Sequence, residues 1–471
     1  MSASTATVPR TGLSALLDDI ERDAPGIDVR PSSPGTAEYA HDAGTAPRQG
    51  TGTTDGPAVA FPATVGEVQQ LVRLAARHGV SVVPRGAGTG LSGGATAHTE
   101  QLVISTDRLN RIVEISPADE VAVVEPGVLN ATLNEHLSPL GLFYAPDPAS
   151  WRISTIGGNI ATNAGGLRCA KYGVTRESVL ALDVVLADGS LVSIGHRSIK
   201  GVTGLDLVSL FVGSEGVLGI VVGATVRIRP LPVARRTVSA FFDSTPAGAA
   251  AIGAITASRV RPSVIEFLDE PTLEGIDAAN DSGLRARGAA LLLIELDGFG
   301  IDEQTAELTT ALAAAGGRVQ VESEPDAEVL WELRRSGRRF DEGSWFVGGD
   351  VAVPKSRIAE VFAAFPAIEA RHGVAVSAVA HAGDGNLHPV VTLPVPAGAD
   401  AALVPAALHD AADDIVRTAL ALGGTVSGEH GIGTVKRALA AEELAARVRS
   451  AQLAIKDSLD PAGLFNPGKA L

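Results

Sequence analysis

The chain has 471 residues, which at roughly 150 residues per domain leaves room for two to four domains. It carries 54 acidic and 38 basic side chains, a net charge of -16, which argues against nucleic acid or an anionic membrane surface as its main partner. The single cysteine, Cys169, can form neither an internal disulfide nor a cysteine-based zinc site. No basic segment followed by an apolar stretch opens the chain, and no apolar run is long enough to span a membrane. We therefore expect a cytoplasmic protein.

The first part of the chain alternates between strand and helix signals. After a helix at 13–21, residues up to 56 form a lead-in rich in Gly, Pro, Ser and Thr. A capping box, Thr64 to Glu67, begins a helix that Gly79 ends. The expected elements that follow are strands at 80–84, 102–105 and 121–125, a helix at 129–137, a hairpin of 182–187 and 191–194 around Asp188-Gly189, and a long strand at 216–230.

The second part has the order strand, helix, strand, strand, helix, strand, which is typical of a ferredoxin-like α+β layer. The elements lie at 235–243, 246–259, 263–268, 290–297, 303–315 and 319–323. Further helices are expected at 326–339, 356–371 and 405–422, with more helix in the last 45 or so residues. We expect an α+β protein with a lead-in at 1–56, domains at 57–232 and 233–425, and a C-terminal segment at 426–471.

Three glycine-rich stretches stand out in the first domain. The stretch from Gly88 to Gly93 matches G-x-G-x-x-G and follows a predicted strand, and Asp107 lies near where a ribose-binding acid would be expected. However, only seven residues, 95–101, precede the next strand, which leaves no room for the crossover helix of a Rossmann unit. The backbone amides of 85–94, with the hydroxyls of Thr89 and Ser92, can still form an anion-binding concavity. The alternative is a glycine-rich turn without function.

A second glycine-rich loop at 155–166 and a constriction at 212–216 repeat this pattern. Glycine lets the backbone approach a ligand closely. Three such stretches in one domain suggest a long ligand that lies along the backbone.

Two histidines and a glutamate form the clearest chemical cluster in the second half. His381 and His388 flank a Gly-Asp-Gly-Asn turn signal, so their imidazoles are expected to converge from neighbouring strands. Glu429, in the glycine-rich segment 427–433, is available as a third ligand, and two imidazoles with a carboxylate suit Zn²⁺, with Mn²⁺ or Fe²⁺ as alternatives. Ordinary loop histidines are the other interpretation. Asp384, within the turn, is expected to cap backbone amides rather than bind metal.

Together these motifs resemble a known family. The glycine loops, Pro146-Asp-Pro148, Lys171-Tyr-Gly173 and 212–216 are similar to the FAD-binding domain of the vanillyl-alcohol oxidase/p-cresol methylhydroxylase superfamily. Within it the chain resembles the branch of glycolate oxidase catalytic subunits, D-lactate dehydrogenases and D-2-hydroxyglutarate dehydrogenases. The resemblance implies a two-subdomain FAD-binding domain of the PCMH type, then a ferredoxin-like substrate or cap domain, then a C-terminal helical segment that returns to the FAD site.

The resemblance also implies the residues that bind FAD. The flavin is expected to be noncovalent, although Cys169 and His98 are conceivable covalent anchors. The implied FAD-binding residues are Pro84, Arg85, Gly86, Ala87, Gly88, Thr89, Gly90, Ser92, Gly93, Pro146, Asp147, Thr155, Gly157, Gly158, Ala161, Asn163, Gly165, Gly166, Tyr172, Glu215, Gly216, Ile220, Val221, Val222 and Asn466.

The branch implies a reaction as well. His381, His388 and Glu429 would hold a divalent metal, zinc being the first expectation, and His430 would remove the substrate's hydroxyl proton while the Cα hydride passes to flavin N5. Glu429 could instead hydrogen-bond a water that faces the substrate. Arg334, at the family's W-x-x-R position, and Arg338, one helical turn later, are candidates for the substrate carboxylate, with a solvated basic helix face as the alternative.

Two departures bear on the substrate. D-2-hydroxyglutarate dehydrogenases carry a lysine and an asparagine where this chain has Gly348 and Val390. The expected activity is therefore oxidation of a small D-2-hydroxy acid, D-lactate or glycolate, or of a larger apolar 2-hydroxy acid. A different alcohol substrate, or a role as one subunit of a multi-chain glycolate oxidase, are the alternatives. The electron acceptor is left open among quinone, cytochrome, electron-transfer flavoprotein and oxygen.

Overall fold

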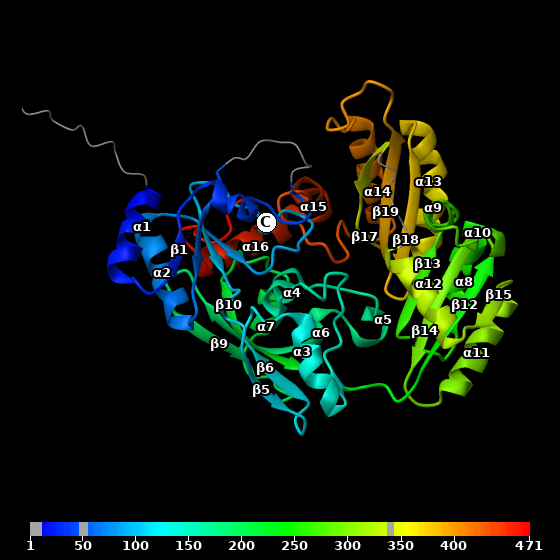
Figure 1. The fold of residues 1–471 in the computed structure, drawn as a ribbon, viewed down its shortest axis with the longest axis horizontal. Helices are drawn as coiled ribbons and strands as arrows, with labels where there is room; N and C mark the ends of the chain where they lie inside the picture. Colours follow the sequence, from blue (N-terminus) through cyan, green and yellow to red (C-terminus); the bar gives the residue numbers. More distant parts are fainter. Residues whose placement is uncertain (1–11, 47–54, 337–342) are drawn as a thin grey trace, which may run out of the picture. The chain divides into compact units, whose positions relative to one another are not determined.

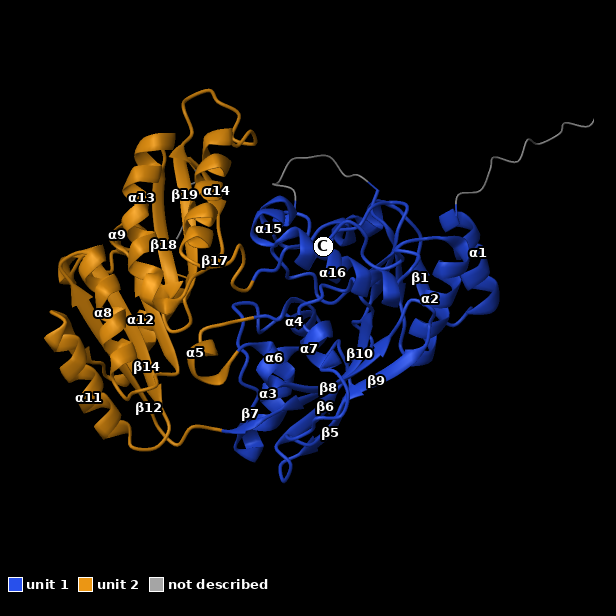
Figure 2. Ribbon diagram, turned by 180° about the vertical axis from the view of Figure 1, so that it is seen from behind, with its two compact units in different colours: residues 1–164, 174–230, 430–471 blue, residues 165–173, 231–429 orange. Residues whose placement is uncertain are grey.

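The computed structural model describes residues 12–46, 55–336 and 343–471. They form two compact units, which Figure 2 shows in different colours. Unit 1 takes in the described residues up to 164 together with 174–230 and 430–471, and unit 2 takes in 165–173 and 231–429. Within the described ranges no helix has both the length and the hydropathy needed to cross a membrane.

The first sheet of unit 1 has the order β1-β2-β4-β3, in which β2, β4 and β3 are parallel and β1 is an antiparallel edge. Helices α1 and α2 pack their apolar faces on it, with Leu16 and Leu71 fully buried. The predicted N-cap and C-cap of α2 are confirmed, because Thr64 Oγ1 accepts the Glu67 N–H at 3.2 Å and Gly79 is left-handed with φ 64. The reciprocal bond of the predicted capping box differs, because Glu67 Oε2 accepts the N–H of Ala63 at 2.7 Å instead of that of Thr64. The bounds are α1 Gly12–Asp23, β1 Asp28–Arg30, the 3₁₀ turn Pro34–Ala40, β2 Ala58–Phe61, α2 Val65–His78, β3 Val82–Arg85 and β4 Leu102–Ser105.

The connection from β3 to β4 is unusual for parallel strands. The two strands are adjacent and in parallel register, yet residues 86–101 between them contain no helix. This confirms the exclusion of a Rossmann unit, whose phosphate-binding helix would stand here. The glycine-rich loop itself makes the crossover.

The second sheet of unit 1 is antiparallel, with the order β5-β6-β10-β8-β9. Its hairpin around Asp188-Gly189 is confirmed. The single strand expected at 216–230 is wrong in its bounds, because Glu215 and Gly216 have positive φ and β10 begins only at Ile220. The bounds are β5 Ile112–Ser116, β6 Val121–Val124, α3 Asn130–Leu137, the 3₁₀ turn Ser138–Leu140, β7 Leu142–Phe143, α4 Ile156–Thr162, α6 Thr175–Ser178, β8 Val179–Val185, β9 Leu191–Gly195, α7 Leu207–Phe211, β10 Ile220–Arg227 and β11 Arg229–Pro230, which pairs with β7.

Unit 2 is built on an eight-stranded sheet with the order β15-β12-β14-β13-β18-β19-β16, and β17 also pairs with β19. The first four strands, taken in chain order, lie in the order 4-1-3-2, as the predicted ferredoxin-like layer requires, so the α+β class is confirmed. The sequence analysis missed two helices, α9 and α10, between β13 and β14. The bounds are α5 Cys169–Tyr172, β12 Arg235–Phe242, α8 Thr245–Ala257, β13 Val264–Leu268, α9 Glu270–Asn280, α10 Leu284–Arg287, β14 Ala290–Asp297, α11 Ile301–Ala314, β15 Arg318–Val321, α12 Glu324–Ser336, β16 Ser344–Gly348, β17 Val351–Ala352, the 3₁₀ turn Lys355–Arg357, α13 Ile358–His372, β18 Ala375–His381, β19 Asn386–Pro394 and α14 Ala406–Ala421.

The two faces of this sheet are covered differently. Helices α8, α11, α13 and α14 pack side by side on one face, as Figure 1 shows, and Phe267 of β13 meets Phe362 of α13 there edge to face. On the other face α9, α10 and α12 cover the β12, β14 and β13 side, where Trp331 is buried and donates to Thr237 Oγ1 at 3.0 Å. Glu266, His381 and His388 lie on this second face, because the strand pairing places them there.

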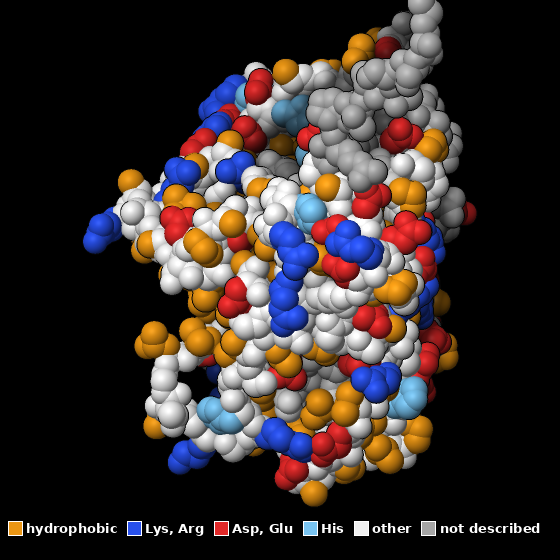
Figure 3. All heavy atoms as spheres, turned by 90° about the vertical axis from the view of Figure 1, so that its left-hand side faces the viewer, with side chains coloured by type: hydrophobic (Ala, Val, Ile, Leu, Met, Phe, Trp, Pro, Cys, Tyr) orange, Lys and Arg blue, Asp and Glu red, His pale blue; other side chains and the backbone are white. Residues whose placement is uncertain are grey.

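The C-terminal residues of unit 1 form α15 (Arg437–Glu443), α16 (Ala446–Leu459) and an extended end. That end pairs with the first sheet, since Phe465 forms a parallel bridge with Val82 of β3. Figure 3 shows basic and acidic side chains interspersed over one face of the molecule.

Candidate functional site

The hairpin of β18 and β19 brings the two predicted histidine ligands together. His381 ends β18 opposite Asn386, while His388 lies opposite Val379, so the imidazoles are diagonal neighbours on one face. Their ring centroids are 5.0 Å apart with an interplanar angle of 81°. The turn between them is tight at Gly385, whose φ is 95 and where a β-carbon would overlap the carbonyl oxygen of Val353. The convergence expected from the turn signal is thus present.

Glu429 completes the cluster within unit 2. Its Oε1 lies 3.1 Å from His388 Nε2 and 3.8 Å from His381 Nε2, and one ligand atom from each of the three residues lies within 4.8 Å of the others. Burial opposes ionisation, but hydrogen bonds from the two histidines lower the pKa of Glu429 well below its usual range. Two imidazoles and one carboxylate are a donor set that suits a divalent cation.

Asp350, which the sequence analysis missed, holds the segment that carries Glu429. Its buried carboxylate accepts hydrogen bonds from Ser427 Oγ at 2.7 Å and from the backbone N–H groups of Gly428 at 3.1 Å and Glu429 at 3.3 Å. The neighbouring β17 adds a bridge from Ala352 to Thr425. These contacts hold the backbone at Glu429 in place. The third candidate ligand is therefore positioned by hydrogen bonds, although it lies outside a helix or strand.

Glu266 is the second residue that the sequence analysis missed. It lies in the middle of β13 with no exposed side-chain surface, and its Oε1 is 2.6 Å from His381 Nδ1. Burial opposes its ionisation, but the charges of Arg334 and His381 outweigh burial and lower the pKa of Glu266. The available signal was a single acid in the otherwise apolar strand 264–268, since a charge at a core position requires a partner.

The two arginines predicted to bind the substrate carboxylate have different outcomes. Arg334 lies in the last turn of α12, where Nε donates to Glu266 Oε2 at 2.5 Å and Nη2 pairs with the same oxygen. Its guanidinium is therefore committed in part to Glu266. Arg338 lies outside the described residues.

Unit 1 contains the first glycine loop, and the side chain of Arg85 lies beneath it. The guanidinium donates to the carbonyl oxygens of His41 at 2.8 Å and Ala95 at 3.1 Å, and a β-carbon at Gly88 would overlap it. Burial lowers the pKa of Arg85. The lead-in also hydrogen-bonds the loop, since Ala43 N–H donates to the Gly88 carbonyl at 3.0 Å. Arg85 thus holds the loop in place through hydrogen bonds to backbone carbonyl oxygens of the lead-in and of the loop itself.

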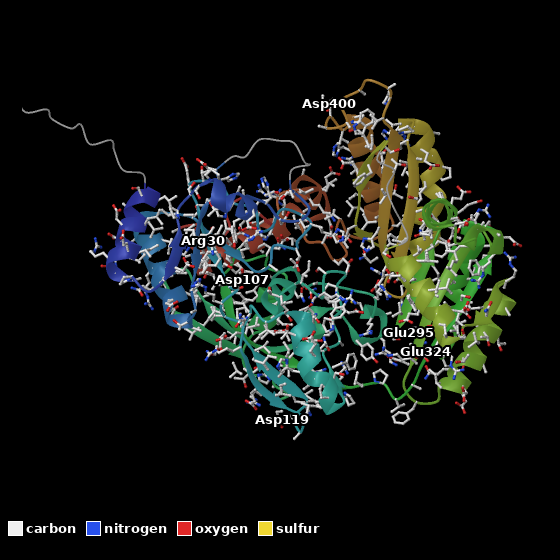
Figure 4. All side chains as sticks on the ribbon, in the orientation of Figure 1. Arg30, Asp107, Asp119, Glu295, Glu324 and Asp400 are labelled. Atoms are coloured by element: carbon white, nitrogen blue, oxygen red, sulfur yellow. The ribbon has the colours of Figure 1, made fainter. Side chains whose placement is uncertain are left out.

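The loop leaves polar groups that suit a bound cofactor. Within the described part of the chain, the buried Ser92 Oγ and Asn159 Nδ2 have no hydrogen-bond partner. Gly88 and Gly93 have φ of 70 and 81, a left-handed conformation that favours glycine, and successive backbone amides in such a loop can form an anion-binding concavity. An FAD pyrophosphate and its sugar would supply acceptors and donors for such groups, so the residues present fit the implied cofactor. Asp107, labelled in Figure 4, follows β4 in the same unit, and burial raises its pKa.

The second glycine stretch, predicted as a loop at 155–166, is helical over most of its length. Residues 156–162 form helix α4, capped by Thr155, whose Oγ1 accepts the Gly158 N–H at 3.1 Å, and ended by left-handed Asn163. A β-carbon at Gly86 would overlap Thr155 Oγ1, and one at Gly157 would lie 2.5 Å from Pro126 Cβ. The glycines of the two stretches therefore allow close packing around the start of α4.

Glu215 and Asn466 join the remaining predicted segments of unit 1. The Glu215 carboxylate accepts the N–H groups of Ile432 at 2.8 Å and Gly433 at 2.7 Å, and its pKa is raised by burial. Asn466 Nδ2 donates to the carbonyl oxygens of Gly94 at 2.9 Å and Glu215 at 2.7 Å. These bonds bring the C-terminal end of the chain to the first glycine loop.

Other predicted residues divide between the units. Pro146 follows β7 in unit 1, with its carbonyl bound by Asn130 Nδ2 at 2.8 Å, and Ile220 to Val222 lie in β10. Unit 2 contains the predicted residues Gly165, Gly166 and Tyr172. The Tyr172 hydroxyl donates to Asp297 Oδ2 at 2.7 Å, and burial raises the pKa of Tyr172. Glu429 is the last residue of unit 2 before the chain continues in unit 1 with His430.

Comparisons with known proteins agree with these observations. A model of the FAD binding domain matches residues 57–195, and a model of the C-terminal domain of FAD linked oxidases matches residues 231–470. The chain is 39% identical over 420 residues to glycolate oxidase subunit GlcD of Bacillus subtilis, covering 88% of each protein. It is 32% identical over 416 residues to a D-lactate dehydrogenase of Archaeoglobus fulgidus, covering 88% of this chain and 91% of the relative. A solved p-cresol methylhydroxylase with bound substrate shares the fold, with a TM-score of 0.77 over 98% of each chain at 17% identity.

Proposed function

The chain belongs to the family of FAD-linked oxidases, and from that premise we propose that it uses FAD to oxidise D-lactate or glycolate to the 2-oxo acid. The relatives named above as a glycolate oxidase subunit and a D-lactate dehydrogenase support this substrate class. The observation that carries the proposal is the cluster of buried His381 with partly buried His388 and Glu429, because a hydroxy acid can chelate a cation held by three protein ligands.

In the proposed site these three residues hold a divalent cation, with Zn²⁺ the best match to the ligand types. Such a cation, when bound, would polarise the substrate's hydroxyl oxygen as a Lewis acid, and bound FAD would accept a hydride at N5. The electrostatics favour a cation, because burial opposes protonation of His381 and yet Glu266 and Glu429 raise its pKa well above the usual range.

His430 is the proposed base. An imidazole nitrogen of His430 takes the hydroxyl proton, and the C–H bond of the same carbon gives up its electron pair with the hydrogen, which leaves a C=O group. Two electrons and two hydrogens thus leave the substrate, one hydrogen as a proton and one as a hydride.

The substrate carboxylate needs a cationic partner. Arg334 binds Glu266 through Nε and Nη2, and we assign Nη1, for which the described residues show no partner, to the carboxylate. Arg338 remains a second candidate for the same role. The pairing of Gly348 with Val390 on the sheet face of His388 supports a substrate without a second charged group, because neither side chain offers a partner for a distal carboxylate.

A second candidate is that the chain works as one subunit of a larger glycolate oxidase. The similarity to a Bacillus subtilis protein that is a glycolate oxidase subunit favours it. The acceptor that reoxidises the flavin would then dock on a partner subunit, and a quinone, a cytochrome, an electron-transfer flavoprotein and oxygen are the candidates. A single cysteine supports a reducing compartment such as the cytoplasm.

An anaerobic absorbance titration tests the proposal. The purified protein is mixed with D-lactate, L-lactate, glycolate and D-2-hydroxyglutarate, before and after treatment with a chelator. We expect D-lactate or glycolate to bleach the flavin band and the chelator to abolish bleaching. A loaded flavin that no hydroxy acid reduces would contradict the proposed substrate class.

A further inference from the structure

Glu266 occupies a position in β13 that the fold alone does not require to be acidic. Its strand neighbours from Val264 to Leu268 are apolar and buried, and Glu266 itself has no exposed surface. Placing a carboxylate there is unfavourable unless both oxygens are hydrogen-bonded. They are, and to two different partners: Oε1 to His381 Nδ1 at 2.6 Å, and Oε2 to Arg334 Nε at 2.5 Å.

This arrangement fixes the hydrogen of His381. An ionised carboxylate can only accept hydrogen bonds, so Nδ1 must carry the hydrogen. The lone pair of a neutral imidazole then lies on Nε2, the atom that faces Glu429 Oε1 at 3.8 Å. His381 is thereby prepared as a ligand through Nε2.

Arg334 supplies the positive charge with which the buried Glu266 carboxylate pairs. Its side chain is only 12% exposed, and two of its nitrogens bind one carboxylate oxygen. The same glutamate therefore orients a candidate metal ligand on one side and the candidate carboxylate-binding arginine on the other.

We infer that Glu266 is a positioning residue of the metal centre, which holds His381 in the Nδ1–H tautomer and so sets the affinity of the site for a divalent cation. The inference rests on the metal site of the proposed function. It does not depend on the identity of the oxidised substrate. Hydrogen-bond partners of metal-binding histidines typically change metal affinity by about 10- to 100-fold when they are replaced.

Glu322 offers a matched control in the same unit. Its side chain is also buried, at 1% exposure, and it pairs with Arg287 Nη2 at 3.3 Å and accepts a hydrogen bond from Ser239. Among the described residues, its side-chain hydrogen bonds go to Ser239, Arg287 and Gln320 and to none of the three candidate ligands. Replacing either glutamate by glutamine removes one buried charge from an arginine pair, but only Glu266→Gln alters the partner of a histidine.

The experiment measures metal binding by the FAD-loaded protein. Zn²⁺ affinity is determined by competition with a chromophoric chelator, and the visible absorption of bound Co²⁺ reports the coordination. We expect Glu266→Gln to weaken Zn²⁺ binding by about 10- to 100-fold and to shift the Co²⁺ bands, while Glu322→Gln changes neither. Equal Zn²⁺ affinity and an unchanged Co²⁺ spectrum in Glu266→Gln would overturn the inference.

A measurement on the wild-type protein covers the case in which Glu266→Gln does not fold. Long-range ¹H–¹⁵N correlation of histidine-labelled, Zn²⁺-loaded protein should show Nδ1–H and metal-bound Nε2 for His381, and metal bound through Nδ1 would overturn the inference. The outcomes separate the two proposals. A protein that shows this signature but is reduced by no hydroxy acid contradicts the substrate proposal alone, and normal reduction with unchanged Zn²⁺ affinity in Glu266→Gln contradicts the inference alone.

Discussion

Gly348 lies directly opposite Val390 where β16 pairs with β19, two residues beyond His388 on the same face of the sheet. Apart from Gly348 and its two chain neighbours, no heavy atom of the described residues lies within 4 Å of where a β-carbon on Gly348 would stand. A long side chain at this position would therefore meet no steric barrier from those residues, and its charge would act close to the proposed substrate site.

Gly348→Lys should improve the use of a dicarboxylate. The added ammonium offers a partner to the distal carboxylate of D-2-hydroxyglutarate, and one attractive contact of this kind is worth about 1 kcal/mol, or roughly a fivefold to tenfold gain in kcat/KM. The measurement is the ratio of kcat/KM for D-2-hydroxyglutarate to that for D-lactate. Gly348→Met, of similar length without charge, is the control. If both variants shift the ratio equally, charge is not the cause.

Removal of one metal ligand should abolish metal binding without disturbing the flavin. His388→Ala and Glu429→Gln leave two of three protein ligands, and we expect the zinc content after purification to fall well below one per chain while the FAD absorbance is retained. Elemental analysis beside a flavin spectrum checks this. His372→Ala removes a histidine of unit 2 that pairs with Asp414 instead, and it should keep its metal. Stoichiometric zinc in His388→Ala would rule out this residue as a ligand.

His430→Ala should separate cofactor binding from chemistry. A missing general base slows a reaction by typically 10²- to 10⁴-fold, whereas the cofactor contacts lie elsewhere in the proposed site. Stopped-flow measurement of anaerobic flavin reduction gives the rate, and the flavin spectrum gives the occupancy. A variant that is reduced at the wild-type rate would exclude His430 as the base.

Local signals predicted the histidine pair, and long-range contacts account for what was missed. His381 and His388 flank one turn, so a turn signal and strand alternation were enough to bring them together. Glu266 is 115 residues from His381, and Asp350 is 78 residues from Gly428, so no spacing rule connects them. Glu266, an acid in an otherwise apolar strand, indicated that a buried partner must exist, but the sequence did not indicate which residue it is.

The glycine stretches show a different limit. The segment 155–166 contains two pairs of glycines, Gly157-Gly158 and Gly165-Gly166. Because glycine disfavours helix, this composition predicted a loop. The caps Thr155 and Asn163 outweigh that propensity, and packing on Pro126 requires the small residue at Gly157. Similarly, Arg85 was assigned to the cofactor loop by family resemblance, but only the structure showed that its guanidinium binds backbone carbonyls of the lead-in.

Gly88→Val should lower FAD occupancy and stability together. Gly88 has φ 70, a conformation that a β-branched residue rarely adopts, and the new side chain would overlap Arg85. The flavin-to-protein absorbance ratio and the thermal midpoint should both fall. Gly253→Ala is the control, because Gly253 lies within α8 and a β-carbon there would meet no described atom within 4 Å apart from the helix's own backbone and its chain neighbours. Alanine there should stabilise the helix by up to about 1 kcal/mol. Full FAD occupancy in Gly88→Val would contradict the assignment of this loop to the cofactor.

Asp384→Asn should make stability less dependent on pH. Burial raises the pKa of Asp384 to about 6, from 3.8. Below pH 4 the carboxyl is neutral in both states. Between pH 4 and 6 the unfolded chain loses its proton before the folded protein does, so the wild type loses stability as pH rises through this window. Because the Asp384 residue is exposed, solvent screening makes this loss smaller than the full pKa shift implies. Asparagine keeps the oxygen that accepts the Asn386 N–H at 3.2 Å and carries no charge.

The test compares thermal midpoints of Asp384→Asn and wild type from pH 4.5 to 8, after chelator treatment. The difference in thermal midpoint between Asp384→Asn and wild type should grow in favour of the variant up to about pH 6 and then stay constant. Asp188→Asn gives the opposite sign, because hydrogen bonds from Ser190 lower the pKa of Asp188, so its carboxylate stabilises the folded protein above the pKa of the unfolded chain and loses that contribution as the pH falls. Asp188→Asn should therefore be less stable than wild type at pH 7, with the deficit shrinking at low pH. An advantage of Asp384→Asn that is the same at pH 4.5 and 7 would show that the Asp384 carboxyl is already ionised throughout this range.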